Sequence, residues 1–300
     1  MGSGLGQSGP VDRLVLAPNQ RRDAILEVIR SARERLRLSL FRCSDYRIVD
    51  ELAEAALRKV RVEALLTPRA KGEEAKRLKE LGTVLESMGA EVFRYRDPIV
   101  KYHAKYLVAD DGPAVVSTLN FTAKCFSNTC DFLLVTRDAG VVSGLTKLFE
   151  CDCVSPEAPL PEDLTERLIV GPDRARARLT DLLRNARRSI RIIDHKVSDR
   201  LIVAELKAKK ESGVAVEVLG SGQLGELRPH GKMMLVDDAR AVIGSIALAP
   251  LNMDFRREVA VLIQDPGCVA QLKEFFQGVA AKPSGPAADK DEEEEVEDDD

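Results

Sequence analysis

The chain contains an internal repeat, and this repeat restricts the fold more than any other feature of its 300 residues. Arg13–Pro18 resembles Arg167–Pro172, and Ile29–Arg33 resembles Leu183–Arg187, both at an offset of 154 positions. Later segments match at an offset of 127, so the first copy carries about 27 additional residues in the Lys/Glu-rich stretch around Pro68–Gly89. A repeat of this length predicts two homologous halves, and such halves often pack about a pseudo-twofold axis.

Segments with strand and helix periodicity alternate within each half. In the first half we expect a strand at Leu14–Ala17, a helix at Asn19–Arg35, a strand at Leu36–Phe41, a helix at Ile48–Leu57, and strands at Val60–Leu66, Tyr106–Ala109 and Ala114–Thr118. The second half repeats this order. The predicted fold class is therefore α/β, with two homologous α/β/α halves, each built on a largely buried sheet.

Charge and proline content suggest where the halves begin and end. The last twelve residues carry a charge of −9 in a chain of net charge −4, which leaves residues 1–288 at +5. We expect a mildly basic folded body and a disordered, solubilising acidic tail. The predicted organisation is a flexible N-terminus at 1–10, a first half at 11–150, a Pro-rich linker at 151–164, a second half at 165–280 and the tail at 281–300.

The remaining composition predicts a cytoplasmic protein with reduced cysteines. No apolar run approaches the ~18 residues of a membrane span, and residues 1–10 lack the charged and apolar regions of a signal peptide. Four cysteines invite a zinc interpretation, but their spacing is not that of a zinc knuckle and no histidine lies among them. We therefore expect no metal and no cofactor. These cysteines are Cys125, Cys130, Cys151 and Cys153.

Two of the three histidines begin the same pattern, H-x-K-x-x-x-x-D, at His103–Asp110 and His230–Asp237. Such a coincidence has very low odds by chance. Each pattern supplies one histidine, one lysine and one aspartate. These are His103, Lys105 and Asp110 in the first half, and His230, Lys232 and Asp237 in the second.

The segments that follow the two patterns also correspond. Ser117–Asn120 follows the first pattern and Gly244–Ala247 follows the second. Together they resemble the doubled H-x-K-x₄-D-x₆-G-S-x-N motif of the phospholipase D superfamily, and the resemblance covers residues ~11 to ~280. It implies two phospholipase D-like halves that share one active site. Four positions depart from the family's pattern: Ala247 stands for its second Asn, Ser117 and Thr118 for Gly-Ser, and Asp131 for a Glu.

The chemistry of a phosphodiester explains why these residue types occur together. Its negative oxygens repel a nucleophile unless fixed cations and neutral donors hold them. We expect Lys105 and Lys232 to supply the charge, and Asn120, Ser245 and Thr118 to supply hydrogen bonds to the substrate phosphate.

Histidine suits both remaining roles because its reference pKa lies near neutrality. One imidazole attacks phosphorus to give a phosphohistidine, and the other donates a proton to the leaving oxygen. The resemblance implies that the N-terminal histidine, His103, is the nucleophile and that His230 is the acid. Because the two halves supply both motifs, we predict a competent monomer.

Acidic residues are expected to hold the histidines in place. Asp131 and Glu258 each lie 28 residues past a motif histidine, and the resemblance implies that they fix the second ring nitrogens. Asp110 and Asp237 are expected to buttress the motifs or to be plain turn residues. His195, at the end of the predicted strand Ile190–Ile193, is either a residue of the active-site rim or a structural histidine.

Three interpretations of function remain open. The first is a metal-independent phosphodiesterase or phosphatidyltransferase that acts on phospholipids and contacts the inner membrane face peripherally, as the resemblance to cardiolipin synthases and bacterial phospholipases D implies. The second is an endonuclease, although no basic-aromatic stripe supports nucleic-acid binding. The third is an inactive phosphate- or lipid-binding scaffold, which the retained His/Lys pairs disfavour.

Overall fold

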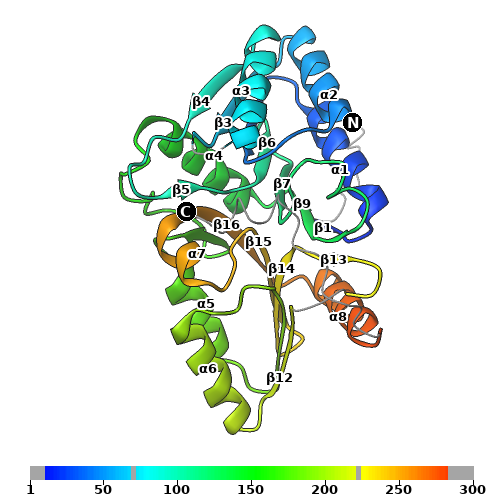
Figure 1. Cartoon of the computed structure of the whole chain (residues 1–300), viewed down its shortest axis with the longest axis vertical. Coiled ribbons are helices and arrows are strands. Elements are labelled where there is room, and N and C mark those ends of the chain that lie inside the picture. The colour runs from blue at the N-terminus through cyan, green and yellow to red at the C-terminus, as the bar shows by residue number, and fades with distance from the viewer. Residues whose placement is uncertain (1–10, 69–71, 221–223, 283–300) are drawn as a thin grey trace, which may run out of the picture.

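The computed structural model describes residues 11–68, 72–220 and 224–282, and two sheets form its framework (Figure 1). The expected flexible N-terminus at 1–10 and residues 283–300 of the acidic tail lie outside the described residues. The first sheet has the order β1-β9-β7-β6-β2-β3-β4. Its strands are β1 Asp12–Val15, β2 Arg35–Leu40, β3 Arg61–Leu66, β4 Glu91–Arg94, β6 Tyr106–Ala109, β7 Ala114–Ser117 and β9 Leu133–Thr136.

The second sheet repeats this order as β10-β16-β15-β14-β11-β12. In both sheets the last strands listed run parallel, as in β2-β3 and β11-β12, whereas the other neighbours are antiparallel. The strands are β10 Leu168–Gly171, β11 Ser189–Ile193, β12 Ala215–Leu219, β14 Lys232–Val236, β15 Arg240–Gly244 and β16 Arg256–Ile263. The repeat in the sequence therefore corresponds to a repeat in topology.

Helices cover the outer faces of both sheets and lie between them (Figure 1). The first half contains α1 Pro18–Ser31, α2 Tyr46–Leu57, α3 Gly72–Ser87 and α4 Ala139–Val154. The second half contains α5 Ala175–Arg184, α6 Arg200–Glu211, α7 Pro250–Phe255 and α8 Pro266–Ala280. Helix α3 and strand β4 have no counterpart in the described residues of the second half, and they account for the extra segment of the first.

The packing of the halves follows a pseudo-twofold arrangement. Helix α4 of the first half contacts β10 of the second, and α8 of the second contacts β1 of the first. One hydrophobic cluster runs through both halves, whereas α1 and α2 cover the first sheet with a separate cluster and α5 and α6 cover the second with another. Members of the shared cluster include Tyr102, Leu134, Leu145, Val261 and Leu272. The α/β expectation is confirmed.

Some boundaries differ from those expected. Helix α1 stops at Ser31 rather than Arg35, because the backbone N–H groups of Arg33, Glu34 and Arg35 donate to the Asp110 carboxylate instead of continuing the helix. Cys151–Val154, expected at the start of the linker, form the last turn of α4. Within the described ranges, no helix combines the length and apolar character that a membrane crossing requires.

Candidate active site

Two very short strands place the motif histidines at the junction of the halves. Strand β5 (Lys101–Tyr102) precedes His103 and pairs in parallel with the first residues of β16 in the second half. Strand β13 (Arg228–Pro229) precedes His230 and pairs in parallel with β8 (Thr129–Cys130) of the first half. The chain therefore crosses to the opposite half immediately before each histidine.

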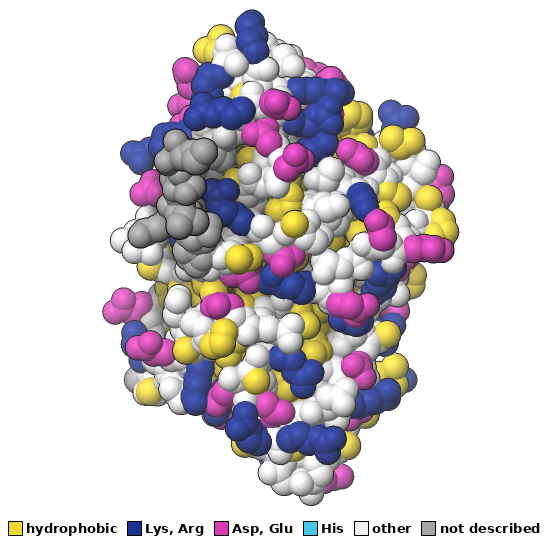
Figure 2. Space-filling model, turned by 180° about the vertical axis from the view of Figure 1, so that it is seen from behind, with side chains coloured by type: hydrophobic (Ala, Val, Ile, Leu, Met, Phe, Trp, Pro, Cys, Tyr) yellow, Lys and Arg dark blue, Asp and Glu magenta, His cyan; other side chains and the backbone are white. Residues whose placement is uncertain are grey.

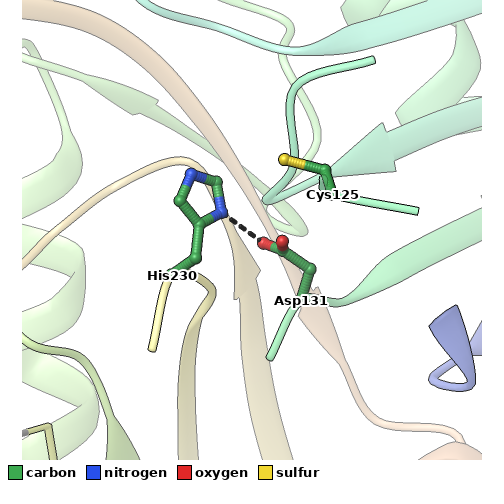
Figure 3. Close-up of side chains that lie close together, drawn as sticks. All are labelled: Cys125, Asp131 and His230. Carbon is green, nitrogen blue, oxygen red and sulfur yellow. Dashed lines mark hydrogen bonds and ion pairs between the residues drawn. The ribbon is translucent and has the colours of Figure 1, made fainter. Parts of the chain in front are cut away.

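This crossing exchanges the acidic partners of the histidines. His103 Nδ1 lies 2.7 Å from Glu258 Oε1, and His230 Nδ1 lies 2.8 Å from Asp131 Oδ1, the pair drawn in Figure 3. Both carboxylates are fully buried. A carboxylate at Nδ1 accepts the N–H of that nitrogen and so leaves Nε2 of each ring for chemistry.

The lysines differ in what they contact. Lys105 Nζ lies 2.9 Å from His103 Nε2 and also donates to the His103 carbonyl oxygen at 3.0 Å. Lys232 Nζ donates to the carbonyl oxygen of His230 at 2.8 Å. Because an ammonium has only donors, Nε2 of His103 must be its acceptor and therefore carries a lone pair. The resting site thus presents His103 as a neutral imidazole with Nε2 unprotonated.

An aromatic side chain completes the surroundings of the first pair. The Phe41 ring meets the His103 ring edge-on with centroids 4.7 Å apart, and Lys105 Nζ lies 5.1 Å from the Phe41 centroid. Such contacts restrict the histidine ring and favour the nearby cation. At the repeat offset, the residue equivalent to Phe41 is His195, which is half-buried just beyond β11.

Asp131 is held on both oxygens by hydroxyl groups. Thr118 donates to Oδ1 and Thr129 donates to Oδ2, each at 2.5 Å. Burial acts to raise the pKa of this carboxyl, but the attraction and hydrogen bond of His230 and the charge of Arg21 outweigh it and lower the pKa. Asp131 is therefore an ionised, doubly hydrogen-bonded carboxylate. Thr118 also accepts from the Phe132 amide, so its hydroxyl is engaged within the protein.

Arg21 on α1 is an essential support of Asp131 that the sequence analysis missed. Its side chain is fully buried, and its two terminal nitrogens donate to the carbonyl oxygens of Leu16, Cys125, Thr129 and Asp131 at 2.8–2.9 Å. The guanidinium therefore fixes the loop that carries Asp131. Position 175, its equivalent at the repeat offset, is an alanine.

Glu258 has a different support. Asn252 Nδ2 donates to Glu258 Oε1 at 2.9 Å, the same oxygen that faces His103. The other oxygen, Oε2, is buried and accepts no hydrogen bond from the residues that the structure describes. Asn252 was also missed, and its equivalent in the first half is Cys125 at the offset of 127.

The predicted phosphate-binding residues Asn120 and Ser245 are both buried beside the motifs. Asn120 Oδ1 has no hydrogen-bond partner among the described residues. The Ser245 hydroxyl is already engaged, since it donates to the Val259 carbonyl oxygen and accepts from the Val259 amide. In the resting site Ser245 ties the motif to β16, and Asn120 retains an unused amide oxygen.

Asp194 lies on the His230 side and was not singled out beforehand as a site residue. It is buried, and its carboxylate accepts from the amides of Lys196 and Leu248. Burial raises its pKa, which attraction to Lys232 partly offsets. Its equivalent in the first half is Leu40, so this carboxylate belongs to the second half alone.

Asp110 and Asp237 lie at the turns after β6 and β14, with positive φ angles of 48° and 58°. Asp110 accepts from the backbone N–H groups of residues 33–35, and Asp237 from those of residues 187–189. Partial burial acts to raise the pKa of both carboxyls, but these backbone donors outweigh it and lower the pKa. Both residues thus tie the motif strand to the neighbouring strand.

Comparisons with known proteins identify proteins that share the fold. Residues 25–153 match a family described as "Cardiolipin synthase, PLD-like domain". No curated protein matches the chain in sequence. Among solved structures, phosphatidylserine synthase of Haemophilus influenzae Rd KW20 superposes with a TM-score of 0.74 at 12% identity, over 90% of this chain and 86% of that one.

Polyphosphate kinase of Porphyromonas gingivalis superposes with a TM-score of 0.70 at 19% identity, over 89% of this chain. The chain spans only 46% of that kinase.

The fold and the two exchanged histidine–carboxylate pairs define a duplicated α/β protein with one composite site at the junction of its halves. Residues 25–153 therefore match a phospholipase D-like domain, and the fold of most of the chain is similar to that of these two proteins.

Proposed function

We propose that the chain is a metal-independent phosphodiesterase or phosphatidyltransferase that acts on phospholipids through a phosphohistidine. The observation that carries this proposal is the pair of buried carboxylates that hold His103 and His230 from opposite halves. Each ring thereby keeps Nε2 for chemistry while a lysine lies within two residues of it. One chain supplies both pairs, so the proposed active species is a monomer.

In the first step, the lone pair of His103 Nε2 attacks phosphorus and the bond from phosphorus to the leaving oxygen breaks. His230 donates the proton on its Nε2 to that oxygen. Lys105, which contacts His103 Nε2 in the resting site, moves onto a phosphate oxygen. Lys232 and the Asn120 amide neutralise and hold the remaining oxygens.

In the second step, the oxygen of water or of an alcohol attacks the phosphohistidine. His230 Nε2 takes the proton of the incoming hydroxyl, and the bond from phosphorus to His103 breaks. Glu258 stabilises the positive charge that His103 carries in the intermediate, because it accepts the Nδ1–H throughout. Water gives phosphatidic acid, and an alcohol gives a transferred phosphatidyl group.

Two observations favour a phospholipid over nucleic acid as the substrate. The matched family is described as cardiolipin synthase-like, and a phosphatidylserine synthase shares the fold over most of both chains. Figure 2 shows basic and acidic side chains interspersed over the one face of the molecule that it draws. Peripheral contact with the inner membrane face and a cytoplasmic location accompany this proposal.

The test is a product analysis by mass spectrometry. Purified protein is incubated with mixed phospholipid vesicles in excess EDTA, beside His103→Ala, His230→Ala and Arg13→Met. The last variant is the control, because Arg13 pairs with Glu27 at the exposed surface. We expect phosphatidic acid or cardiolipin from wild type and Arg13→Met only.

The substrate assignment is wrong if wild type leaves every phospholipid unchanged while it cleaves DNA, RNA or polyphosphate in parallel incubations. Rapid-quench trapping with a ³²P-labelled phospholipid tests the nucleophile separately. Label on His103 supports the order of steps given above, whereas label on His230 reverses it.

A further inference from the structure

Three side chains of different chemistry meet beside the second histidine. The Cys125 sulfur, an Asp131 oxygen and a His230 ring nitrogen lie within 4.8 Å of one another. Figure 3 draws these three side chains. Cys125 and Asp131 are buried, and the His230 side chain is 14% exposed. Thiolate, carboxylate and imidazole are the three ligand types that zinc binds most often in proteins.

The equivalent position in the other half shows that the thiol is not required to support the acid. There, Asn252 donates an amide N–H to Glu258. In the first half, Thr118 and Thr129 already donate to both oxygens of Asp131. Cys125 therefore occupies the position of Asn252 beside an acid whose two oxygens already accept from hydroxyl groups.

The spacing and charge suit a thiophilic divalent cation. Zinc–sulfur and zinc–nitrogen bonds of about 2.3 and 2.0 Å place tetrahedral ligands roughly 3.5 Å apart, so small side-chain rotations close the group around a metal. A thiolate and a carboxylate neutralise the two positive charges of the ion.

We propose that Cys125, Asp131 and His230 form an inhibitory site for Zn²⁺ and related thiophilic cations. Binding releases the Cys125 thiol proton and the His230 Nδ1 proton to solvent, and His230 keeps the proton on its Nε2. The metal takes the Nδ1 lone pair and an Asp131 oxygen, so the hydrogen bond between these two residues is lost. His230 is then fixed as a donor and cannot accept the proton of the incoming hydroxyl, a consequence that rests on the proposed function.

Metal binding is tested without any assay of activity. The full chain is treated with EDTA, dialysed and titrated with Co²⁺. A thiolate bound to Co²⁺ gives a charge-transfer band in the near ultraviolet. The affinity for Zn²⁺ is then measured from its displacement of Co²⁺. We expect the band in wild type, and its loss with Zn²⁺ binding weakened at least ~100-fold in Cys125→Asn. Cys125→Ser changes the side chain less, and we expect the same loss of the band and the same weakening of Zn²⁺ binding. Cys43→Ser, which alters a half-buried cysteine outside the group, should bind as wild type does.

The consequence for catalysis is measured as phospholipid turnover with and without micromolar Zn²⁺. Wild type should lose at least 90% of its rate and recover it in EDTA, whereas Cys125→Asn, which copies the arrangement around Asn252, should turn over equally in both. A missing thiolate band in wild type, or Zn²⁺ inhibition of Cys125→Asn equal to that of wild type, overturns the inference. If no substrate is turned over, the proposed function fails, and the cobalt titration still decides the metal site.

Discussion

Replacement of Arg21 tests whether the second carboxylate–histidine pair depends on a buried guanidinium. The substitutions are Arg21→Lys, which keeps the charge, and Arg21→Met, which keeps most of the side-chain volume. Arg21 serves four carbonyl oxygens with its planar fork. A lysine has a single nitrogen and cannot reach all four at once.

The structure sets the expected magnitude. Each carbonyl left without its donor in a buried place costs about 1–3 kcal/mol, whereas removal of a buried guanidinium recovers part of its large desolvation cost. For Arg21→Met we expect a net loss of about 3–4 kcal/mol of unfolding free energy, a large share of the ~5–15 kcal/mol typical of a domain. Arg21→Lys should lose about half as much.

Activity should fall further than stability alone explains. The Asp131 carbonyl is one of the four acceptors, so its loop shifts when Arg21 is lost, and a displacement of about 1 Å in a catalytic group costs about 10²-fold in rate. We expect kcat of Arg21→Lys to fall ~10–100-fold with KM changed less than ~3-fold, at a temperature where the variant is fully folded.

Urea unfolding measures the stability change, and phospholipid turnover measures kcat and KM. Arg13→Met is the matched control, because Arg13 pairs with Glu27 at the exposed surface and its loss should cost under ~1 kcal/mol. The reasoning is refuted if Arg21→Met unfolds within 1 kcal/mol of wild type, or if folded Arg21→Lys retains the wild-type kcat.

Three further predictions concern the carboxylates. Asp131→Asn and Glu258→Gln should each lower kcat by ~10²–10⁴-fold, since a neutral amide cannot stabilise the histidine's positive charge and its NH2 group can donate to Nδ1 and select the wrong tautomer; quenched-flow turnover measures this. Burial raises the pKa of Asp152 to about 7, so this carboxyl stabilises the fold most below the unfolded pKa near 4 and loses that contribution as pH rises through 7. Wild type should therefore lose about 2 kcal/mol relative to Asp152→Asn between pH 5 and 7 in urea titrations. Asp110→Ala or Asp237→Ala should cost about 1–3 kcal/mol by the same method but leave kcat within ~3-fold, because their carboxylates bind backbone rather than the motif histidines.

Much of the fold followed from the repeat. Two copies of one strand–helix pattern predict two sheets of equal topology, and the extra Lys/Glu-rich segment became α3 and β4. Local periodicity could not find β5 and β13, because a two-residue strand has no period to detect. These strands nevertheless determine which acid meets which histidine.

The sequence therefore identifies Asp131 and Glu258 as the acids, but it does not show which histidine each of them contacts. Asp131 and Glu258 lie at equal spacing after their own motifs, and that spacing shows equivalence between the halves rather than contact. The sequence contains a clearer signal for Arg21. It lies four residues before Ile25 on the buried side of α1, and an arginine on the apolar face of a helix indicates a buried polar partner.

The exchange of acids explains why the two halves could diverge around a common site. Each histidine needs only a fixed carboxylate at Nδ1, and different neighbours can supply that rigidity. Around Asp131 the support comes from two threonines and Arg21, whereas around Glu258 it comes from Asn252. Because two hydroxyl groups already donate to Asp131, the position equivalent to Asn252 can carry a cysteine, whose thiol lies beside Asp131 and His230 and is a ligand of the proposed metal site.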